Sequence, residues 1–253
     1  MKQHQTHIRK LAVAAALGAA VFLQPLALLA ADGDTQPLKL TLPMPTLKGT
    51  PEDLPKGPGI EPITDKPPGA FEDAAGKTKL LVPIGVKNVA PGVTNVVAGV
   101  TNVVRTKVTS SVPPFTGELS QITDWSKEAF DDHAVEFKKG TQWVQVDLGQ
   151  PYKVYAVAVW HDHRYIQLFR SVIVQVSNDP DFKADVTTLY NNDTDNSSGL
   201  GIGTDKQYFE TRYGRVIDGK GAVGRYVRSY TKGSSQSAIN VHQELEVFGL
   251  PAK

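Results

Sequence analysis

The sequence contains no cysteine, so no disulfide can support its fold. Small exported domains often depend on several disulfides because they cannot bury enough apolar surface. This chain has 253 residues, of which 40% are hydrophobic, and it is long enough for one domain with a sizeable core. Its stability must therefore come from packing and not from covalent cross-links.

An excess of one charge is also missing. The chain has 27 lysines and arginines against 26 aspartates and glutamates. Three of the basic residues lie in an N-terminal leader, so 27 less three leaves 24 basic against 26 acidic residues in the remainder. No basic stripe stands out, and binding to nucleic acid depends on such a surface. Nucleic acid is therefore not an expected partner.

Residues 1–31 have the layout of a secretory signal peptide. A basic start is followed by an apolar run from Leu11 to Leu23, and small residues precede Asp32, where a peptidase would cut. We therefore expect an exported bacterial protein, periplasmic or extracellular, with no transmembrane segment after cleavage. The alternative is an uncleaved anchor, because the apolar run approaches the length that spans a bilayer. No cysteine follows the leader, which argues against a lipid anchor.

Residues 32–87 are predicted to be a proline-rich linker or strap. Eleven of the 17 prolines lie between Pro37 and Pro91, and the segment shows neither a helical nor a strand period. Such a composition favours extended and turn conformations without a packed core. The segment could be a spacer that carries the folded part away from an envelope. It could also be a strap across the folded part, with Leu47 and Ile63 as contacts.

The remainder, residues 88–253, is predicted to be one all-β domain. Short β-rich segments are separated by glycine, asparagine, aspartate and proline, and no long amphipathic helix is evident. In "WVQVDLG" (143–149), Val144, Val146 and Leu148 fall on one face, as in a half-buried strand. The continuous apolar run "VYAVAVW" (154–160) suits a strand buried on both faces. These signals favour an antiparallel jelly-roll β-sandwich.

Five segments, taken in order, resemble a known family. They are "SQITDW" (120–125), "QWVQVDLG" (142–149), "VIVQVSNDPDF" (172–182), "GRYVRSY" (224–230) and "ELEVFG" (244–249). The chain is similar to the discoidin domain, also called the coagulation-factor type C domain, of the galactose-binding-like superfamily. The resemblance implies a jelly-roll sandwich of about eight strands, whose loops at one end hold a carbohydrate, a phospholipid head group or a protein. Members are usually not enzymes.

The resemblance also implies a structural calcium ion, with Asp124, Asp131 and Glu244 as its predicted ligands. Carboxylate and carbonyl oxygens are the ligands that calcium prefers. The family often has glycine after the "TD" pair, whereas this sequence has Trp125 there. A solvated acidic loop without metal is the alternative. No organic cofactor is expected.

The stretch "HDHR" (161–164), which follows the apolar run, is the best candidate for a ligand site. A sugar presents vicinal hydroxyls to charged and amide groups, and an apolar face to an aromatic ring. Histidine, arginine and tyrosine supply such groups here at a strand end, where loops carry function. Histidine, arginine, asparagine and an aromatic residue recur in carbohydrate-binding members of the family. The predicted ligand-binding residues are His161, His163, Arg164, Tyr165, Asn240 and His242.

Two other interpretations of this stretch stay open. His161 and His163 would share one face of a continuing strand, and with His242 as a third ligand three imidazoles could bind zinc. The stretch could also be an ordinary strand end, with Trp160 and Tyr165 in the core and the two histidines in solvent.

A catalytic function finds little support in the sequence. A glycosidase needs two carboxylates facing each other across a cleft, and no serine lies in a glycine elbow. The polar loop 190–205 resembles an EF-hand only faintly, because Thr204 stands where the closing glutamate belongs. We therefore expect a non-catalytic module that binds a glycan or cell-surface polysaccharide. The alternative is a structural or protein-interaction module of the cell envelope that does not bind sugar.

Overall fold

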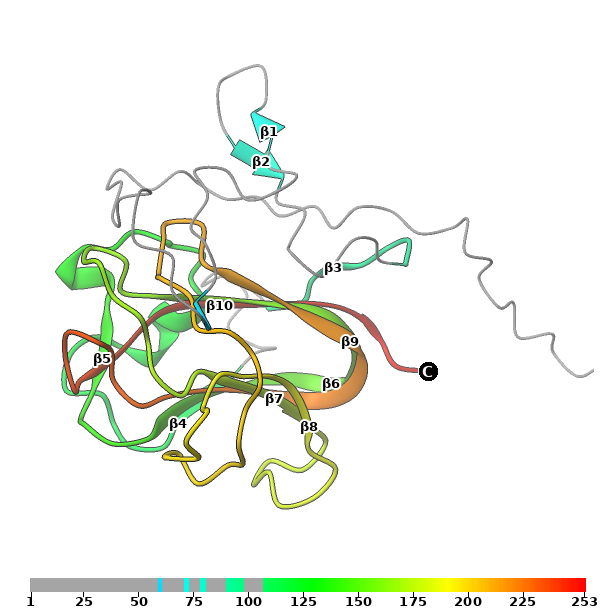
Figure 1. Cartoon of the computed structure of the whole chain (residues 1–253). Coiled ribbons are helices and arrows are strands. Elements are labelled where there is room, and N and C mark those ends of the chain that lie inside the picture. Colours follow the sequence, from blue (N-terminus) through cyan, green and yellow to red (C-terminus); the bar gives the residue numbers. More distant parts are fainter. Residues whose placement is uncertain (1–58, 61–70, 73–77, 81–89, 98–106) are drawn as a thin grey trace, which may run out of the picture. The chain divides into compact units, whose positions relative to one another are not determined.

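The computed structural model describes residues 59–60, 71–72, 78–80, 90–97 and 107–253 (Figure 1). The predicted signal peptide, residues 1–31, lies outside the described residues, as does most of the proline-rich segment 32–87. The predictions for these two segments therefore stay predictions. No helix in the described part is long and apolar enough to cross a membrane.

Strands make up nearly all of the regular structure. The helical elements that the structure describes are two short 3-10 helices, η2 (Leu119–Thr123) and η3 (Asp131–His133). The strands are β1 (Phe71–Glu72), β2 (Thr78–Leu80), β3 (Thr94–Asn95), β4 (Lys107–Ser110), β5 (Val135–Phe137), β6 (Gln142–His161), β7 (Ile173–Ser177), β8 (Thr187–Asn191), β9 (Arg215–Thr231) and β10 (Asn240–Pro251). All pairings between these strands are antiparallel. The predicted fold class is confirmed.

Strands β6 and β9 each belong to two groups of strands. The first half of β6 pairs with β4 and with the end of β9, which also pairs with β7. The second half of β6 pairs with β10 and with the beginning of β9. Side chains from both halves of β6 meet in one core cluster. The two groups of strands are therefore the two layers of a β-sandwich (Figure 1).

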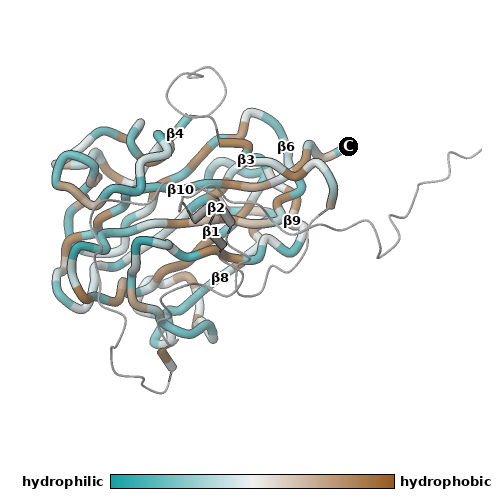
Figure 2. The backbone as a smooth tube through the Cα atoms, turned by 90° about the horizontal axis from the view of Figure 1, so that it is seen from above, coloured by the Kyte–Doolittle hydropathy of each residue, from teal (hydrophilic) through white to brown (hydrophobic). Residues whose placement is uncertain are grey.

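The core follows the alternation of the sequence. Val144, Val146 and Leu148 are buried, as their spacing predicts. They share one cluster with residues of β7, β9 and β10, such as Val174 and Val227. Figure 2 shows hydrophobic residues interspersed with hydrophilic ones along the strands. Because burial of one valine or leucine side chain contributes about 1.5–3 kcal/mol, this cluster can stabilise the domain without disulfides.

The boundary of β6 differs from the prediction. The segments 143–149 and 154–160 are predicted as two strands, but they form one strand. The pairing of β6 with β9 shifts register between Asp147 and Tyr152, and Gly149 has a φ of 81° there. Glycine adopts such a conformation without strain, so the chain passes through an irregularity and continues pairing.

The described part of the proline-rich segment contacts the domain at Gln207. Ile60 forms a parallel bridge with Gln207, whose N–H donates a hydrogen bond of 2.9 Å to the carbonyl of Gly59. The residues that flank this pair lie outside the described ranges, so the choice between spacer and strap stays a prediction.

Candidate functional site

A cavity of about 750 Å³ lies at the end of the sandwich where β6 ends. It is formed by residues 162–169, which follow β6, and by residues 234–239, which connect β9 to β10. Glu136 of β5 and Val241 of β10 complete its wall. We call it the loop cavity. Two of its lining residues, Asp162 and Arg164, belong to the stretch "HDHR" that is predicted to bind a ligand.

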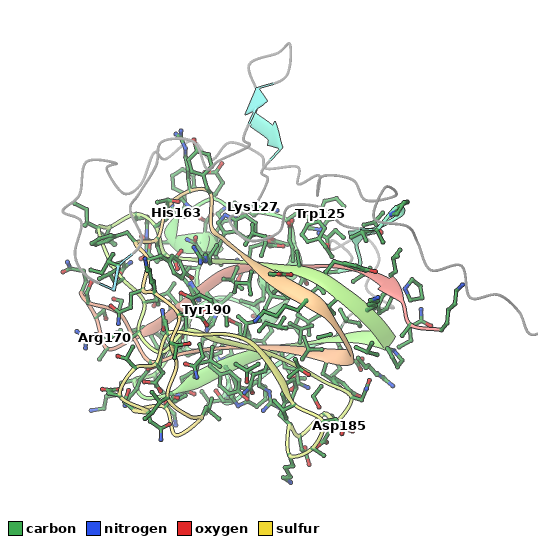
Figure 3. All side chains as sticks on the ribbon, turned by 45° about the vertical axis from the view of Figure 1, so that its right-hand side comes forward. Trp125, Lys127, His163, Arg170, Asp185 and Tyr190 are labelled. Atoms are coloured by element: carbon green, nitrogen blue, oxygen red, sulfur yellow. The ribbon has the colours of Figure 1, made fainter. Side chains whose placement is uncertain are left out.

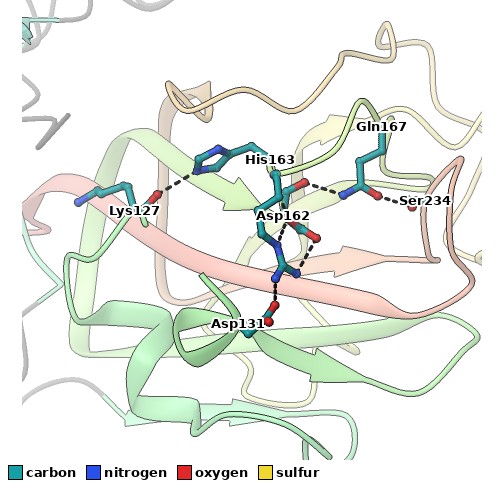
Figure 4. A network of polar contacts seen from close by, with 7 residues as sticks. Lys127, Asp131, Asp162, His163, Gln167 and Ser234 are labelled. Carbon is teal, nitrogen blue, oxygen red and sulfur yellow. Dashed lines mark hydrogen bonds and ion pairs between the residues drawn. The ribbon is translucent and has the colours of Figure 1, made fainter. Parts of the chain in front are cut away.

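A hydrogen-bonded network fixes the wall of the loop cavity (Figure 4). The Asp162 carboxylate accepts hydrogen bonds from the backbone N–H of Arg164 at 3.0 Å, from its Nε at 2.9 Å and from its Nη2 at 3.0 Å. Arg164 Nη1 pairs with Asp131. Gln167 donates to the Asp162 carbonyl at 2.7 Å and accepts from the Ser234 hydroxyl at 2.7 Å. Contacts between three loops therefore hold the polar groups in place.

Apolar side chains stand beside these polar groups. Tyr165 is 58% exposed, and Ile166 and Ile239 are also exposed. The Arg164 guanidinium lies 5.4 Å from the centre of the Tyr165 ring. An exposed aromatic ring next to fixed polar groups can bind a ligand that has both hydroxyl groups and an apolar face.

Negative charge exceeds positive charge around the loop cavity. Arg164 is the cation among its lining residues, and two aspartates already bind the guanidinium. Glu136 adds a third carboxylate. Burial raises the pKa of the Asp162 carboxyl, and the hydrogen bond from the Arg164 backbone opposes this rise. The arginine therefore neutralises the protein's own carboxylates and offers little net charge to a ligand.

The predicted histidines lie beneath the cavity and not on its rim. His161 and His242 are buried, with their ring centres 5.1 Å apart. His161 Nδ1 makes a 2.6 Å hydrogen bond with Glu210, and its ring stacks on Phe169 at 4.6 Å. Burial lowers the pKa of His242 well below its usual value, and the neighbouring His161 adds to this shift. The expectation that these rings face a ligand is corrected, because tertiary contacts cover them.

His163 and Asn240 are also structural in this conformation. His163 is buried, and its Nε2 makes a 2.9 Å hydrogen bond with the Lys127 carbonyl. The Asn240 amide oxygen accepts from Thr231 Oγ1 and Gly233 N–H, both at 2.7 Å. Its nitrogen donates to the carbonyls of residues 138 and 140 at 2.8 and 2.9 Å. All hydrogen-bonding positions of the amide are thus used within the protein.

Of the six predicted ligand-binding residues, Arg164 and Tyr165 line the loop cavity. Ligand contact by these two residues stays a prediction. The zinc interpretation is not supported by the placement of the histidines: within the described ranges, no three His, Cys, Asp or Glu side chains are positioned to hold a metal ion.

Among the residues that the structure describes, the three predicted calcium ligands do not form a group that could hold a metal ion. The Asp131 side chain is 96% exposed and forms an ion pair with Arg164. Asp124 Oδ1 accepts from the Ser126 N–H at 2.8 Å, and Glu244 Oε2 accepts from the Trp125 N–H at 3.0 Å. Between these loops and β10 the structure has an ammonium group, that of Lys127.

One carboxylate of β10 contacts this ammonium group, and a second, that of Glu244, lies within its electrostatic reach. Lys127 Nζ lies 2.5 Å from Glu246 Oε1. Burial raises the pKa of Glu244 well above its usual value and also raises the pKa of Glu246, while the positive charge of Lys127 opposes both shifts. We call these three side chains, with the carbonyl of Trp125, the Lys127 cluster.

Sequence reasoning missed several residues that shape the site. Gln167 and Ser234 are ordinary polar loop residues, and nothing in their neighbourhood in the sequence signals the bond between them. Lys127 lies in a stretch rich in acidic residues, a pattern that predicts a solvent-exposed loop. Glu210 offered a weak signal, since it lies between aromatic residues in "YFETRY". A carboxylate in such surroundings needs a buried partner.

One family model matches part of the β-sandwich. Residues 132–229 match the family model described as "NedA-like, galactose-binding domain". No curated protein matches the chain. A family 89 glycoside hydrolase from Clostridium perfringens is similar in structure, with 14% identity and a TM-score of 0.45 over 63% of this chain. The chain spans 15% of the length of that enzyme.

Two smaller solved structures are also similar. One is the family 32 carbohydrate-binding module of NanJ from C. perfringens in complex with galactose, with 12% identity, a TM-score of 0.41, and coverage of 56% of this chain and 93% of the module. The other is a fucolectin from striped bass (Morone saxatilis) serum, with 16% identity, a TM-score of 0.42, and coverage of 64% and 50%. The family match over residues 132–229, the order of the five motifs and the antiparallel sandwich together show that this part of the chain is similar to the galactose-binding-like domains of the discoidin, or coagulation-factor type C, family.

Proposed function

We propose that this protein is a non-catalytic, exported module that binds a neutral glycan in the loop cavity. The observation that carries the proposal is the exposed Tyr165 ring beside a cavity of about 750 Å³ with fixed polar walls. Ligand sites are typically concave, largely preformed and lined by apolar groups with a few placed polar ones. The family's description as galactose-binding supports a sugar as the ligand.

The charge around the loop cavity supports a neutral sugar over an acidic one. Three N–H groups of Arg164 already bind carboxylates of Asp131 and Asp162. A uronic acid would add a further carboxylate beside these two and Glu136, and like charges in a partly buried site repel each other. Hydroxyl groups can instead share the polar wall without introducing charge.

The arrangement of carboxylates supports binding without catalysis. Asp162 is one of the carboxylates that line the cavity, and the Arg164 guanidinium donates hydrogen bonds to both of its oxygens. A carboxylate engaged in this way is unsuited to proton transfer. Export is proposed from the leader-like residues 1–31.

The test is a glycan-array screen of the full chain, followed by calorimetry with the best ligand. We expect Tyr165→Ala to weaken binding by about tenfold or more, since loss of an aromatic contact worth about 1.4 kcal/mol corresponds to that factor. Ile202→Ala is the matched control, because Ile202 is 72% exposed and does not line the cavity. A neutral hexose should bind better than its uronic acid.

Two outcomes would contradict the proposal. A folded protein that binds no glycan, yet retains a partner from envelope extracts, would favour the alternative of a protein-interaction module. If Tyr165→Ala leaves glycan binding unchanged, the binding site lies outside the loop cavity.

A further inference from the structure

The side chain of Lys127 is 2% exposed, although it lies in the loop between η2 and η3. Lysine is almost never fully buried unless it is paired. Its Nζ lies 2.5 Å from Glu246 Oε1 and donates to the Trp125 carbonyl at 3.1 Å. The Trp160 ring is 5.2 Å away and presents its π system to the charge. The ammonium thus has the partners that a buried cation needs. Figure 3 labels Lys127 and Trp125 among the side chains of the domain.

These partners are oxygen ligands of the kind that calcium prefers. The Lys127 cluster holds a carboxylate oxygen of Glu246 and a backbone carbonyl on the ammonium itself. Glu244 Oε1 is buried there without a hydrogen-bond partner. Glu244 and Asp124 both lie within the electrostatic reach of Lys127. Oxygen atoms of the η2–η3 loop and of β10 that could bind a metal ion therefore lie on either side of the buried Lys127 ammonium.

We propose that the Lys127 ammonium takes the place of a structural calcium ion in this domain. The side chain supplies the cation that joins the η2–η3 loop to β10, so the fold is complete without metal. A calcium ion would need about six to eight oxygen ligands at about 2.3–2.6 Å. It would have to displace the ammonium from Glu246 and the Trp125 carbonyl, and it would be repelled by the lysine while that side chain stays in place.

The same residue links this internal cation to the loop cavity. The Lys127 carbonyl makes a 2.9 Å hydrogen bond with His163, and the next residue, Arg164, lines the cavity. Lys127 therefore joins three segments: its own loop, β10 through Glu246, and the loop that follows β6 through His163. Figure 4 shows the contact with His163. Ligand binding at the cavity should be as independent of calcium as the fold is.

The first test uses the unmodified chain. We expect the same Tm in excess chelator and in millimolar calcium, and no calcium binding by calorimetry, because the cation position is filled. A ligand that binds only the folded state would raise Tm. A Tm that falls under chelator, or calorimetric binding of calcium with a rise in Tm, would overturn the proposal. This test does not depend on whether any variant folds, nor on whether the chain binds a glycan.

The second test compares two substitutions of the same residue. Lys127→Met fills the space with an apolar chain and should lower Tm by roughly ten degrees, since it leaves Glu246 buried and unpaired. Calcium should not restore that loss. Lys127→Ala vacates the space, so millimolar calcium should raise its Tm. An unchanged Tm of Lys127→Ala on addition of calcium would show that these oxygens do not form a cation position, and would overturn the proposal.

Discussion

The Lys127 cluster and the Arg164 network each pair one cation with acidic residues, yet the two regions lie in different environments. Lys127 and Glu246 have side chains that are 2% and 5% exposed. Arg164 is 16% exposed, and its partners are the buried Asp162 and the fully accessible Asp131. The same pairing of charges is thus sealed from water in one region and open to it in the other.

This difference determines what each region can do. In a buried pair, loss of one partner leaves an uncompensated charge in a medium of low polarity, which is strongly destabilising. At the surface, water and salt screen the charges, and an ion pair contributes little to stability. The buried region therefore serves the fold. The open region contributes less to stability, and its groups are accessible to a ligand.

The largest expected effect comes from breaking the buried pair on its acidic side. Glu246→Ala leaves the Lys127 ammonium without its carboxylate, and we expect a loss of about 3–5 kcal/mol in the free energy of unfolding. Urea denaturation followed by tryptophan fluorescence measures it. A loss below about 1 kcal/mol, as exposed pairs show, would mean that the cluster is effectively open to water.

An intermediate effect is expected for Arg164→Ala. Asp162 is buried and would lose its charged donor, so we expect a loss of about 1–3 kcal/mol in unfolding free energy. Glycan affinity should fall as well, because the wall of the loop cavity loosens. The double variant Arg164→Ala/Asp162→Asn removes the buried charge and should recover part of the stability. Equal stability of both variants would contradict this explanation.

The smallest effect is expected for Asp131→Ala. Its carboxylate is 96% exposed, so its pair with Arg164 should contribute no more than about 0.5 kcal/mol. That contribution should shrink further in high salt. The coupling energy between residues 131 and 164, from a double-mutant cycle at two salt concentrations, tests both points. A large coupling energy between residues 131 and 164 that salt does not change would contradict the conclusion that the Arg164 network is open to water.

Much of the fold could be predicted from the sequence. The alternation around Val144 and Val146 predicts the buried face of β6, and the motifs in order indicate the family that residues 132–229 match. The position of the cavity next to residues 161–165 was also predictable, because loops at strand ends carry ligand sites in sandwiches. These features depend on local periodicity, which a sequence records directly.

The roles of individual site residues were harder to predict, because distant segments decide them. His161 and Glu210 are separated by 49 positions, and Lys127 and Glu246 by 119. No local pattern tells whether a histidine or a lysine will be covered. The burial of the histidines and the pairing of Lys127 therefore depend on the three-dimensional arrangement of the strands, which the sequence does not show directly.

The position of β10 has a consequence for how the protein reaches its folded state. This last strand of the chain pairs with β6, β5 and β3, so it completes the middle of one layer and not its edge. These partners precede residues 240–251 in the sequence, so their layer cannot be completed until β10 has been synthesised. Contacts of such high sequence separation make folding slow. A chain leaving a ribosome therefore cannot close this sandwich before β10 has emerged, and deletion of the twelve residues of β10 should prevent folding altogether.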